Sequence, residues 1–144
     1  YFRNSFISIL KYSDDISARA LRNCRISPEE YIKVIRGEIN LESVLADSLS
    51  FQRPNIISEN FRALNPKIDI AAWLRKPYHK RRKPLFDSIT EIVETRDIIV
   101  HTGITDKSIF DKQIQSIIED LIVAVNRVYQ GFGDVFSFEP SFDF

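Results

Sequence analysis

The stretch PLFDSITEIVETRDIIVHTG, residues 84–103, carries the clearest structural signal in this chain. Its apolar residues recur at steps of four and three, which is the spacing of one face of an α-helix. Pro84 stands where a helix commonly begins, and Gly103 stands where a residue of left-handed conformation commonly ends one. The sequence therefore predicts a helix over residues 84–101.

Helical periodicity also marks most of the chain on either side of this stretch. The further helices are expected over residues 3–24, from Pro28 to Gly37, from Asn40, after Pro54, near Ala71–Leu74 and over residues 108–129. The segments from Pro28, Asn40 and Pro54 form either three short helices or two helices with a kink. We therefore predict an all-α fold, a small bundle of about five helices with a long antiparallel pair around Gly103.

The 144 residues are 44% hydrophobic and 28% charged, an ordinary composition for a globular protein. We expect one domain over residues 1–144, because a chain of this length can bury a substantial core. The 20 basic and 20 acidic residues cancel, so overall charge favours neither nucleic acid nor a membrane surface. No apolar run is long enough to cross a membrane, and we expect a cytoplasmic protein.

The last segment, residues 131–144, is rich in phenylalanine, with Phe132, Phe136, Phe138, Phe142 and Phe144. This density of rings is too high for a tail that is surrounded by water. We expect the segment to pack on the helical domain, or to lead into a further segment or a partner.

The chain has a single cysteine, Cys24, and two histidines, His79 and His101. A single cysteine cannot form an intrachain disulfide, and we expect Cys24 to be a buried or half-buried small apolar residue. One cysteine and two histidines are too few for a typical zinc site. We therefore predict that the chain holds no metal and no cofactor.

A charged residue interrupts the apolar face of the 84–101 helix, because Arg96 falls between Ile92 and Ile99. A guanidinium stays charged, and burying it without a partner is very costly. In one interpretation Arg96 reaches the rim of the helix or pairs with a carboxylate in a closed core, as in a helical adaptor of a larger protein. In the other, this face lines a wet cleft or receives an anion from a partner.

His101 follows Arg96 by five residues, so on a continuous helix the two side chains diverge by roughly 140°. Asp97 precedes His101 by one turn and shares its face, which favours a simple Asp97–His101 pair near the end of the helix. Two other arrangements would bring His101 and Arg96 together. Either the helix unwinds near His101, or a two-fold dimer places both pairs in one cleft.

The segment RDIIVHTG, residues 96–103, resembles the Arg–polar–x–x–x–His signature of HEPN domains (higher eukaryotes and prokaryotes nucleotide-binding). Arg96 matches the arginine, Asp97 the polar residue and His101 the histidine. The upstream segment LADSLSFQRPNIISENFRALN is similar to the F-x-x-P-N-I segment of the RiboL-PSP-type subfamily. The resemblance covers residues 40–130 approximately, and it implies an all-helical bundle with the signature near the end of one helix, before the last long helix.

Many HEPN proteins are metal-independent endoribonucleases of toxin–antitoxin, abortive-infection or CRISPR systems, and they typically act as dimers with a composite site. The resemblance implies a homodimeric RNA-cleaving domain of a prokaryotic defence system, controlled by an antitoxin or a regulatory protein. Arg96 would stabilise the phosphorane, His101 would act as the acid–base group, and Asp97 would orient or polarise the pair. Other HEPN domains are inactive, so a module that only dimerises or binds RNA or nucleotides is the alternative.

A basic segment, LRKPYHKRRKP (residues 74–84), precedes the motif helix and contains no acidic residue. We predict that it binds RNA, with its cations on phosphates and its tyrosine stacked on a base. The predicted contacts are Arg75, Lys76, Tyr78, Lys80, Arg81, Arg82 and Lys83. The alternative is a solvated loop or one neutralised by an acidic partner. Because the length of the helix, roughly 25 Å, separates this segment from the motif, we expect it to grip flanking RNA or to serve the site of the partner chain.

Overall fold

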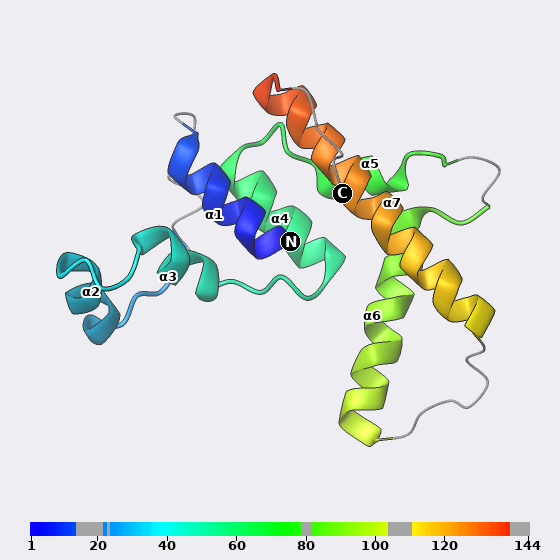
Figure 1. The fold of residues 1–144 in the computed structure, drawn as a ribbon, viewed down its shortest axis with the longest axis horizontal. Helices are drawn as coiled ribbons and strands as arrows, with labels where there is room; N and C mark the ends of the chain where they lie inside the picture. Colours follow the sequence, from blue (N-terminus) through cyan, green and yellow to red (C-terminus); the bar gives the residue numbers. More distant parts are fainter. Residues whose placement is uncertain (14–21, 23, 79–81, 104–110, 139–144) are drawn as a thin grey trace. The chain divides into compact units, whose positions relative to one another are not determined.

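The structure is a computed structural model that describes residues 1–13, 22, 24–78, 82–103 and 111–138. These residues form seven α-helices and no strand (Figure 1), so the all-α prediction is confirmed, with more helices than the predicted five or so. The chain divides into two compact units, unit 1 (Tyr1–Asp69) and unit 2 (Ile70–Phe144), while one domain over residues 1–144 stays a prediction. None of the described helices is long and apolar enough to span a membrane.

Unit 1 contains four helices, α1 (Phe2–Tyr12), α2 (Pro28–Ile35), α3 (Leu41–Asp47) and α4 (Pro54–Leu64). The first helix is shorter than the predicted span of 3–24. Ser13 has an extended backbone and donates its N–H to the carbonyl of Ile9, which ends α1. Residues 14–21 of the predicted span lie outside the described part of the chain.

The three segments after α1 are three separate helices, so the interpretation with a kink is wrong. Their starts follow local rules. The Ser27 hydroxyl accepts the N–H of Glu30 at 3.2 Å, and the Glu30 carboxylate accepts the N–H of Ser27 at 2.8 Å, which together satisfy two free donors at the start of α2. Pro54 occupies the first position of α4, where its missing N–H costs nothing.

The core of unit 1 is a cluster of aromatic rings between α1 and α4. Phe61 has no exposed surface and Phe6 is 1% exposed. Their ring centroids are 5.6 Å apart in an edge-on arrangement, and Phe2 and Phe51 also meet Phe61 edge-on at 6.5 Å and 6.4 Å. Such contacts add to the free energy gained by burying the rings, so this core is held together by side chains of unit 1 itself.

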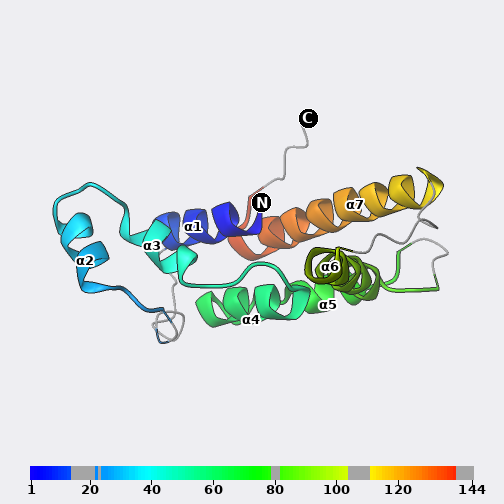
Figure 2. The same cartoon turned by 90° about the horizontal axis from the view of Figure 1, so that it is seen from below.

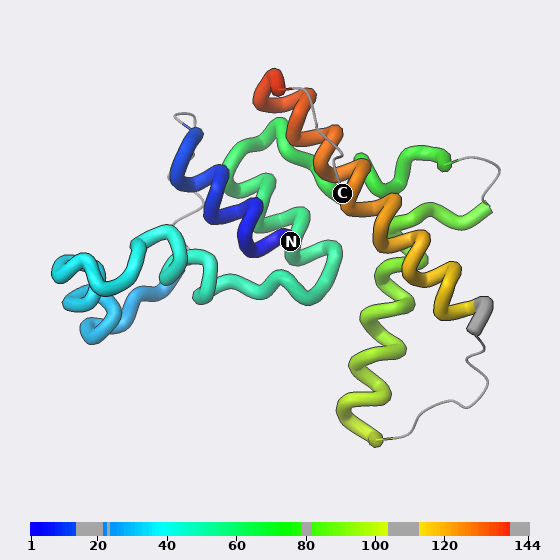
Figure 3. Tube along the Cα trace, in the orientation of Figure 1, coloured from blue at the N-terminus to red at the C-terminus, as the bar shows by residue number. Residues whose placement is uncertain are grey.

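Unit 2 contains α5 (Ile70–Arg75), α6 (Leu85–Thr102) and α7 (Asp111–Phe136), and each of these helices contacts the other two. The tube of Figure 3 shows the Cα traces of α6 and α7 next to each other near the start of α6. Gly103 ends α6 in the left-handed conformation, with φ of 65°, and donates its N–H to Ile99 at 2.9 Å. The predicted bounds of α6 and its glycine cap are therefore confirmed to within one residue.

The predicted close antiparallel pairing of α6 with α7 is not what the structure holds. Figures 1 and 2 show the two helices crossing near the start of α6 and then diverging. The buried residues of α6 are Leu85, Phe86 and Ser88, all near its start. The rest of α6 therefore packs on α7 only loosely, and space opens between the two helices.

α7 runs further than the predicted span of 108–129, because it continues through Gly131 to Phe136. A Cβ atom at Gly131 would overlap the Trp73 ring, which lies directly on the helix backbone, and Trp73 meets Phe132 edge-on at 5.8 Å. The glycine therefore permits close packing of α5 and does not end the helix.

The first part of the Phe-rich segment belongs to α7 itself. Phe138 follows the helix end and packs on Tyr129, with ring centroids 5.5 Å apart. Ser137 has a positive φ of 57°, and Phe138 donates its N–H to Gly133, which resembles a Schellman ending. Within residues 132–138, Phe132 contacts Trp73 and Phe138 contacts Tyr129 while staying 39% exposed, whereas Phe142 and Phe144 lie outside the described residues.

Candidate functional site

An open groove of about 720 Å³ lies between the diverging parts of α6 and α7. It is lined from α6 by Ser88, Glu91, Ile92, Thr95, Arg96 and Ile99, and from α7 by Gln113, Ile114, Ser116, Ile117 and Asp120. Two of the polar lining residues, Ser88 and Asp120, are almost completely buried, at 9% and 6% exposure. The groove combines isoleucine walls with both signs of charge, so it can hold an amphipathic or a polar ligand.

Arg96 lies on this groove and not in a closed core. Its side chain is 56% exposed, and its Nη1 atom is 3.4 Å from Oδ1 of the neighbouring Asp97. Adjacent residues on a helix diverge, and a pair this exposed leaves the guanidinium accessible to solvent. The interpretation in which Arg96 pairs with a carboxylate inside a sealed core is therefore wrong.

His101 does not share the groove with Arg96 in the same chain. α6 stays helical through Thr102, and the Thr102 hydroxyl donates to the carbonyl of Ile98 at 2.7 Å. The predicted unwinding near His101 is therefore wrong. On this continuous helix His101 points roughly 140° away from Arg96 and roughly 160° away from Ile99, which lines the groove. His101 is exposed to solvent on that other face.

Asp97 lies between the two predicted catalytic groups. It is close to Arg96, with its side chain 27% exposed. It also precedes His101 by one helical turn, so both side chains lie on the same side of α6. Asp97 is thus in reach of Arg96 and on the face of His101, which fits the orienting role predicted for it.

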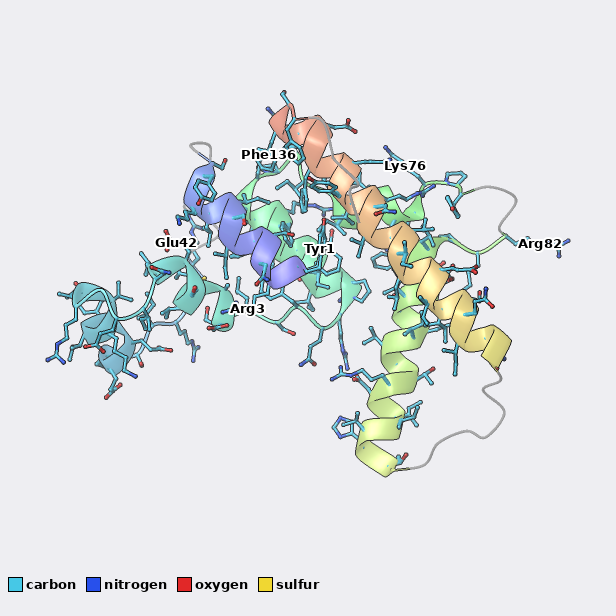
Figure 4. All side chains as sticks on the ribbon, in the orientation of Figure 1. Tyr1, Arg3, Glu42, Lys76, Arg82 and Phe136 are labelled. Atoms are coloured by element: carbon cyan, nitrogen blue, oxygen red, sulfur yellow. The ribbon has the colours of Figure 1, made fainter. Side chains whose placement is uncertain are left out.

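The basic segment 74–84 is attached to the helices at both of its ends. The Arg75 guanidinium lies over the Phe86 ring at 4.2 Å, and Lys83 forms an ion pair with Glu91 of α6. Lys76 and Arg82 are exposed, and in Figure 4 the Arg82 side chain extends away from the helices. The remaining predicted contacts of this segment, Lys80 and Arg81, lie outside the described residues together with His79.

The ion pair of Lys83 brings the basic segment closer to Arg96 than the length of α6 suggests. Glu91 lines the groove and precedes Arg96 by five residues, which is roughly 7.5 Å along the helix axis. The expectation that this segment grips flanking RNA or serves the site of the partner chain stays a prediction.

Arg127 of α7 is a functional candidate that the sequence interpretation missed. It donates from Nη1 to the Lys76 carbonyl at 2.6 Å and from Nη2 to the Pro77 carbonyl at 2.8 Å. Its guanidinium carbon lies 5.0 Å from the centre of the Tyr78 ring. A signal was present, because Arg127 falls at helical spacing between Ala124 and Gly131, on the face that packs on α5.

Within the part of the chain that the structure describes, no group of three or more histidine, cysteine or acidic residues could hold a metal ion. Cys24 is half-buried, as predicted. Comparisons of the chain with protein-family models, curated proteins and solved structures find no match. The resemblance to HEPN domains therefore stays a prediction that rests on the sequence segments in which it was found.

Proposed function

We propose that this chain is a metal-independent endoribonuclease domain of the HEPN type that acts as a homodimer. The observation that carries the proposal is the position of Arg96. A permanently charged guanidinium on an apolar helical face lies in an open groove, where a phosphate can reach it. The groove is next to the basic segment, whose Lys83 contacts Glu91 on its wall.

The proposed reaction uses the 2′-hydroxyl of RNA as the nucleophile. Its oxygen forms a bond to the adjacent phosphorus while the bond from phosphorus to the 5′-oxygen breaks. The 2′-hydroxyl proton passes to the imidazole of His101, and the leaving 5′-oxygen takes its proton from the imidazolium so formed, so the products carry a 2′,3′-cyclic phosphate and a 5′-hydroxyl. Arg96 stabilises the charge that develops on the phosphorane, and Asp97 orients the two groups.

A second copy of the chain supplies the missing partner of Arg96. Since His101 lies on a different face of α6 from the groove, one chain alone does not bring both groups to one phosphate. A two-fold axis can place His101 of one copy beside Arg96 of the other. The diverging parts of α6 and α7 leave large apolar side chains for such a contact, namely Ile98, Val100, Ile114, Ile118, Leu121 and Ile122.

RNA would be held by the basic segment, through Arg75, Lys76, Tyr78, Lys80, Arg81, Arg82 and Lys83. A ribonuclease of this kind harms the cell that makes it, so an antitoxin or a regulatory protein would control it. We place it in the cytoplasm, within a prokaryotic defence or toxin–antitoxin system, because that is the setting of the HEPN ribonucleases whose signature it resembles.

A second candidate is a non-catalytic module that dimerises and binds RNA or a nucleotide. The observation that favours it is the separation of His101 from the groove on an unbroken helix. This module would use the same basic segment and the same apolar surface but would need no proton transfer.

Cleavage of single-stranded RNA in the presence of EDTA tests the choice between the two. The proposed enzyme should release fragments with 2′,3′-cyclic phosphate ends, and Arg96→Ala and His101→Ala should each abolish their release. Glu94→Ala, which changes another exposed residue of α6, is the matched control and should keep the activity. RNA binding without cleavage at any pH between about 5 and 9 would identify the non-catalytic module.

A further inference from the structure

Arg127 holds the start of the basic segment by an unusually complete set of contacts. Its two terminal nitrogens donate to consecutive carbonyls, those of Lys76 and Pro77, and Nη1 also reaches the Trp73 carbonyl at 3.5 Å. These carbonyls belong to the last turn of α5 and the residues after it, where the helix leaves acceptors without partners of its own. The planar fork of an arginine matches this arrangement, and an ammonium group does not.

The same guanidinium supports the Tyr78 ring from one side. Its central carbon lies 5.0 Å from the ring centroid, which is the range of a cation–π contact, and the Tyr78 residue is half-buried. Arg127 therefore fixes both the backbone that leads into Tyr78 and the orientation of its ring. A ring whose orientation is fixed before binding loses less entropy when a base stacks on it.

Contacts with α6 hold the two ends of the same segment. Arg75 lies over Phe86, and Lys83 pairs with Glu91. Arg75 and Lys83 already make these contacts within the protein. Lys76 and Arg82 are exposed and available to phosphates. The described parts of the segment, residues 74–78 and 82–84, are thus held by the helices, and they present the Tyr78 ring and the exposed cations Lys76 and Arg82.

We infer that Arg127 is a positioning residue for RNA binding, which sets Tyr78 as a stacking platform for a base and Lys76 beside it for a phosphate. This inference rests on the proposed RNA binding of the basic segment. Arg127 is assigned no contact with RNA, because both of its terminal nitrogens donate to carbonyls of the protein. Its contribution is therefore independent of salt, unlike that of a cation that binds a phosphate.

The test is the affinity of the full chain for a fluorescein-labelled single-stranded 2′-O-methyl RNA, which lacks the nucleophile and stays intact. Fluorescence anisotropy gives Kd at several salt concentrations from about 50 to 200 mM. Arg127→Lys and Arg127→Gln should each weaken binding roughly tenfold at every salt concentration, which corresponds to the loss of one base stack. Neither variant should change the slope of log Kd against log salt.

Two further variants show what other roles look like in this assay. Arg82→Gln removes an exposed cation of the segment and should lower the salt slope by about one. Arg36→Gln removes an exposed arginine of unit 1 and should change neither the affinity nor the slope. The Arg127 variants are expected to differ from both.

Each alternative outcome has a definite meaning. Unchanged affinity together with a lower melting temperature would show that Arg127 only caps α5, and a salt slope lowered by Arg127→Gln would show a direct phosphate contact; both overturn the inference and keep the proposed RNA binding. If the unmodified chain does not bind the RNA, both the inference about Arg127 and the proposed RNA binding of the basic segment are wrong. If the Arg127 variants do not fold, Tyr78→Leu should show the tenfold loss and Tyr78→Phe should not, and equal binding by both overturns the inference.

Discussion

Two regions of the molecule, the ring cluster between α1 and α4 of unit 1 and the diverging parts of α6 and α7 of unit 2, treat their apolar residues in opposite ways. In unit 1, Phe6 and Phe61 are at most 1% exposed and lie in a cluster of rings supplied by the unit itself. In the diverging parts of α6 and α7, Ile98 and Val100 of α6 are 60% and 65% exposed. The rings of the first region are covered by side chains of unit 1, whereas the second region leaves apolar surface of the kind that a partner covers. The contrast separates residues that maintain the fold from residues available for function.

The largest effect is expected on the open side of this comparison, in RNA cleavage. Arg96→Ala and His101→Ala should each lower the rate at least about 100-fold, the scale of a lost acid–base group or charge-stabilising donor. Chains of the two variants, refolded together in equal amounts, should recover about one quarter of the unmodified rate. Half of the dimers are then mixed, and one of the two sites in a mixed dimer is intact.

The control for this mixing experiment replaces one partner by the chain that carries both substitutions. That mixture has no dimer with an intact site, so its rate should stay at the level of the single variants. A lack of recovery in the first mixture, with dimers present, would place both groups of the site in one chain. The open region between α6 and α7 would then need no partner chain for the reaction.

The next effect compares a buried ring with an exposed aliphatic residue. Phe61→Ala removes the centre of the unit 1 core and should lower the free energy of unfolding by about 3–5 kcal/mol, measured by urea denaturation. Ile98→Asp should separate the dimer, as sedimentation would show, and should change the stability of the monomer by less than about 0.5 kcal/mol.

The control for Ile98→Asp is Gln130→Asp. It introduces the same charge at an exposed position of α7 that lies outside the proposed dimer surface. It should leave the dimer intact. An Ile98→Asp chain that still sediments as a dimer, or an unmodified chain that is monomeric at all concentrations, would show that another occupant covers this surface.

Local signals in the sequence predicted most helix boundaries well. The cap at Ser27, the proline at the start of α4 and the glycine after α6 act through neighbouring residues, so the sequence alone contains the whole cause. The divergence of His101 from Arg96 also follows from the helical repeat. The interpretation in which the helix unwinds near His101 was wrong. Helix ends and the directions of side chains along one helix could therefore be predicted from the sequence.

The errors concern contacts between residues far apart in the chain. Gly131 suggests a helix end until the Trp73 ring is placed against it, and no pattern near Gly131 contains that ring. The hydrogen bond from Arg127 to the Lys76 carbonyl depends in the same way on how helices meet. The groove itself results from the crossing of α6 and α7, which periodicity does not determine.

A smaller effect concerns the closed part of unit 2, where α5 packs on α7. Gly131→Ala would stabilise an isolated helix by about 1 kcal/mol. Here the added methyl group overlaps the Trp73 ring, so we expect a net loss of about 1–3 kcal/mol in the free energy of unfolding. In a Trp73→Leu background the same substitution should be much less harmful, and the difference between the two backgrounds measures the contact. If Gly131→Ala alone raised the urea midpoint of unfolding, the close packing of Trp73 on Gly131 would be contradicted.

The smallest effect is an exposed ion pair that joins α1 to α3 in unit 1. Nε of Arg3 donates to Oδ1 of Asp47 at 2.6 Å, and this bond holds the pKa of Asp47 below its ordinary value. A lowered pKa in the folded state means that the unfolded chain takes up the proton first as the pH falls. The stabilisation is therefore fully present above the ordinary carboxyl pKa of about 4 and is lost as the pH falls through the lower value of the folded state.

The two side chains are 42% and 58% exposed, so solvent screens the pair and its contribution should be about 0.2–1 kcal/mol. Urea midpoints of the unmodified chain and of Asp47→Asn should differ at neutral pH and converge in acid, and added salt should reduce the difference. Glu38→Gln is the control, since its pair with Arg36 is longer, at 3.8 Å, and lies within one short segment. A difference that persists unchanged in acid would mean that Asp47→Asn acts on the packing between α1 and α3. The contact between these two helices of unit 1 would then rest on apolar contacts more than on the surface ion pair.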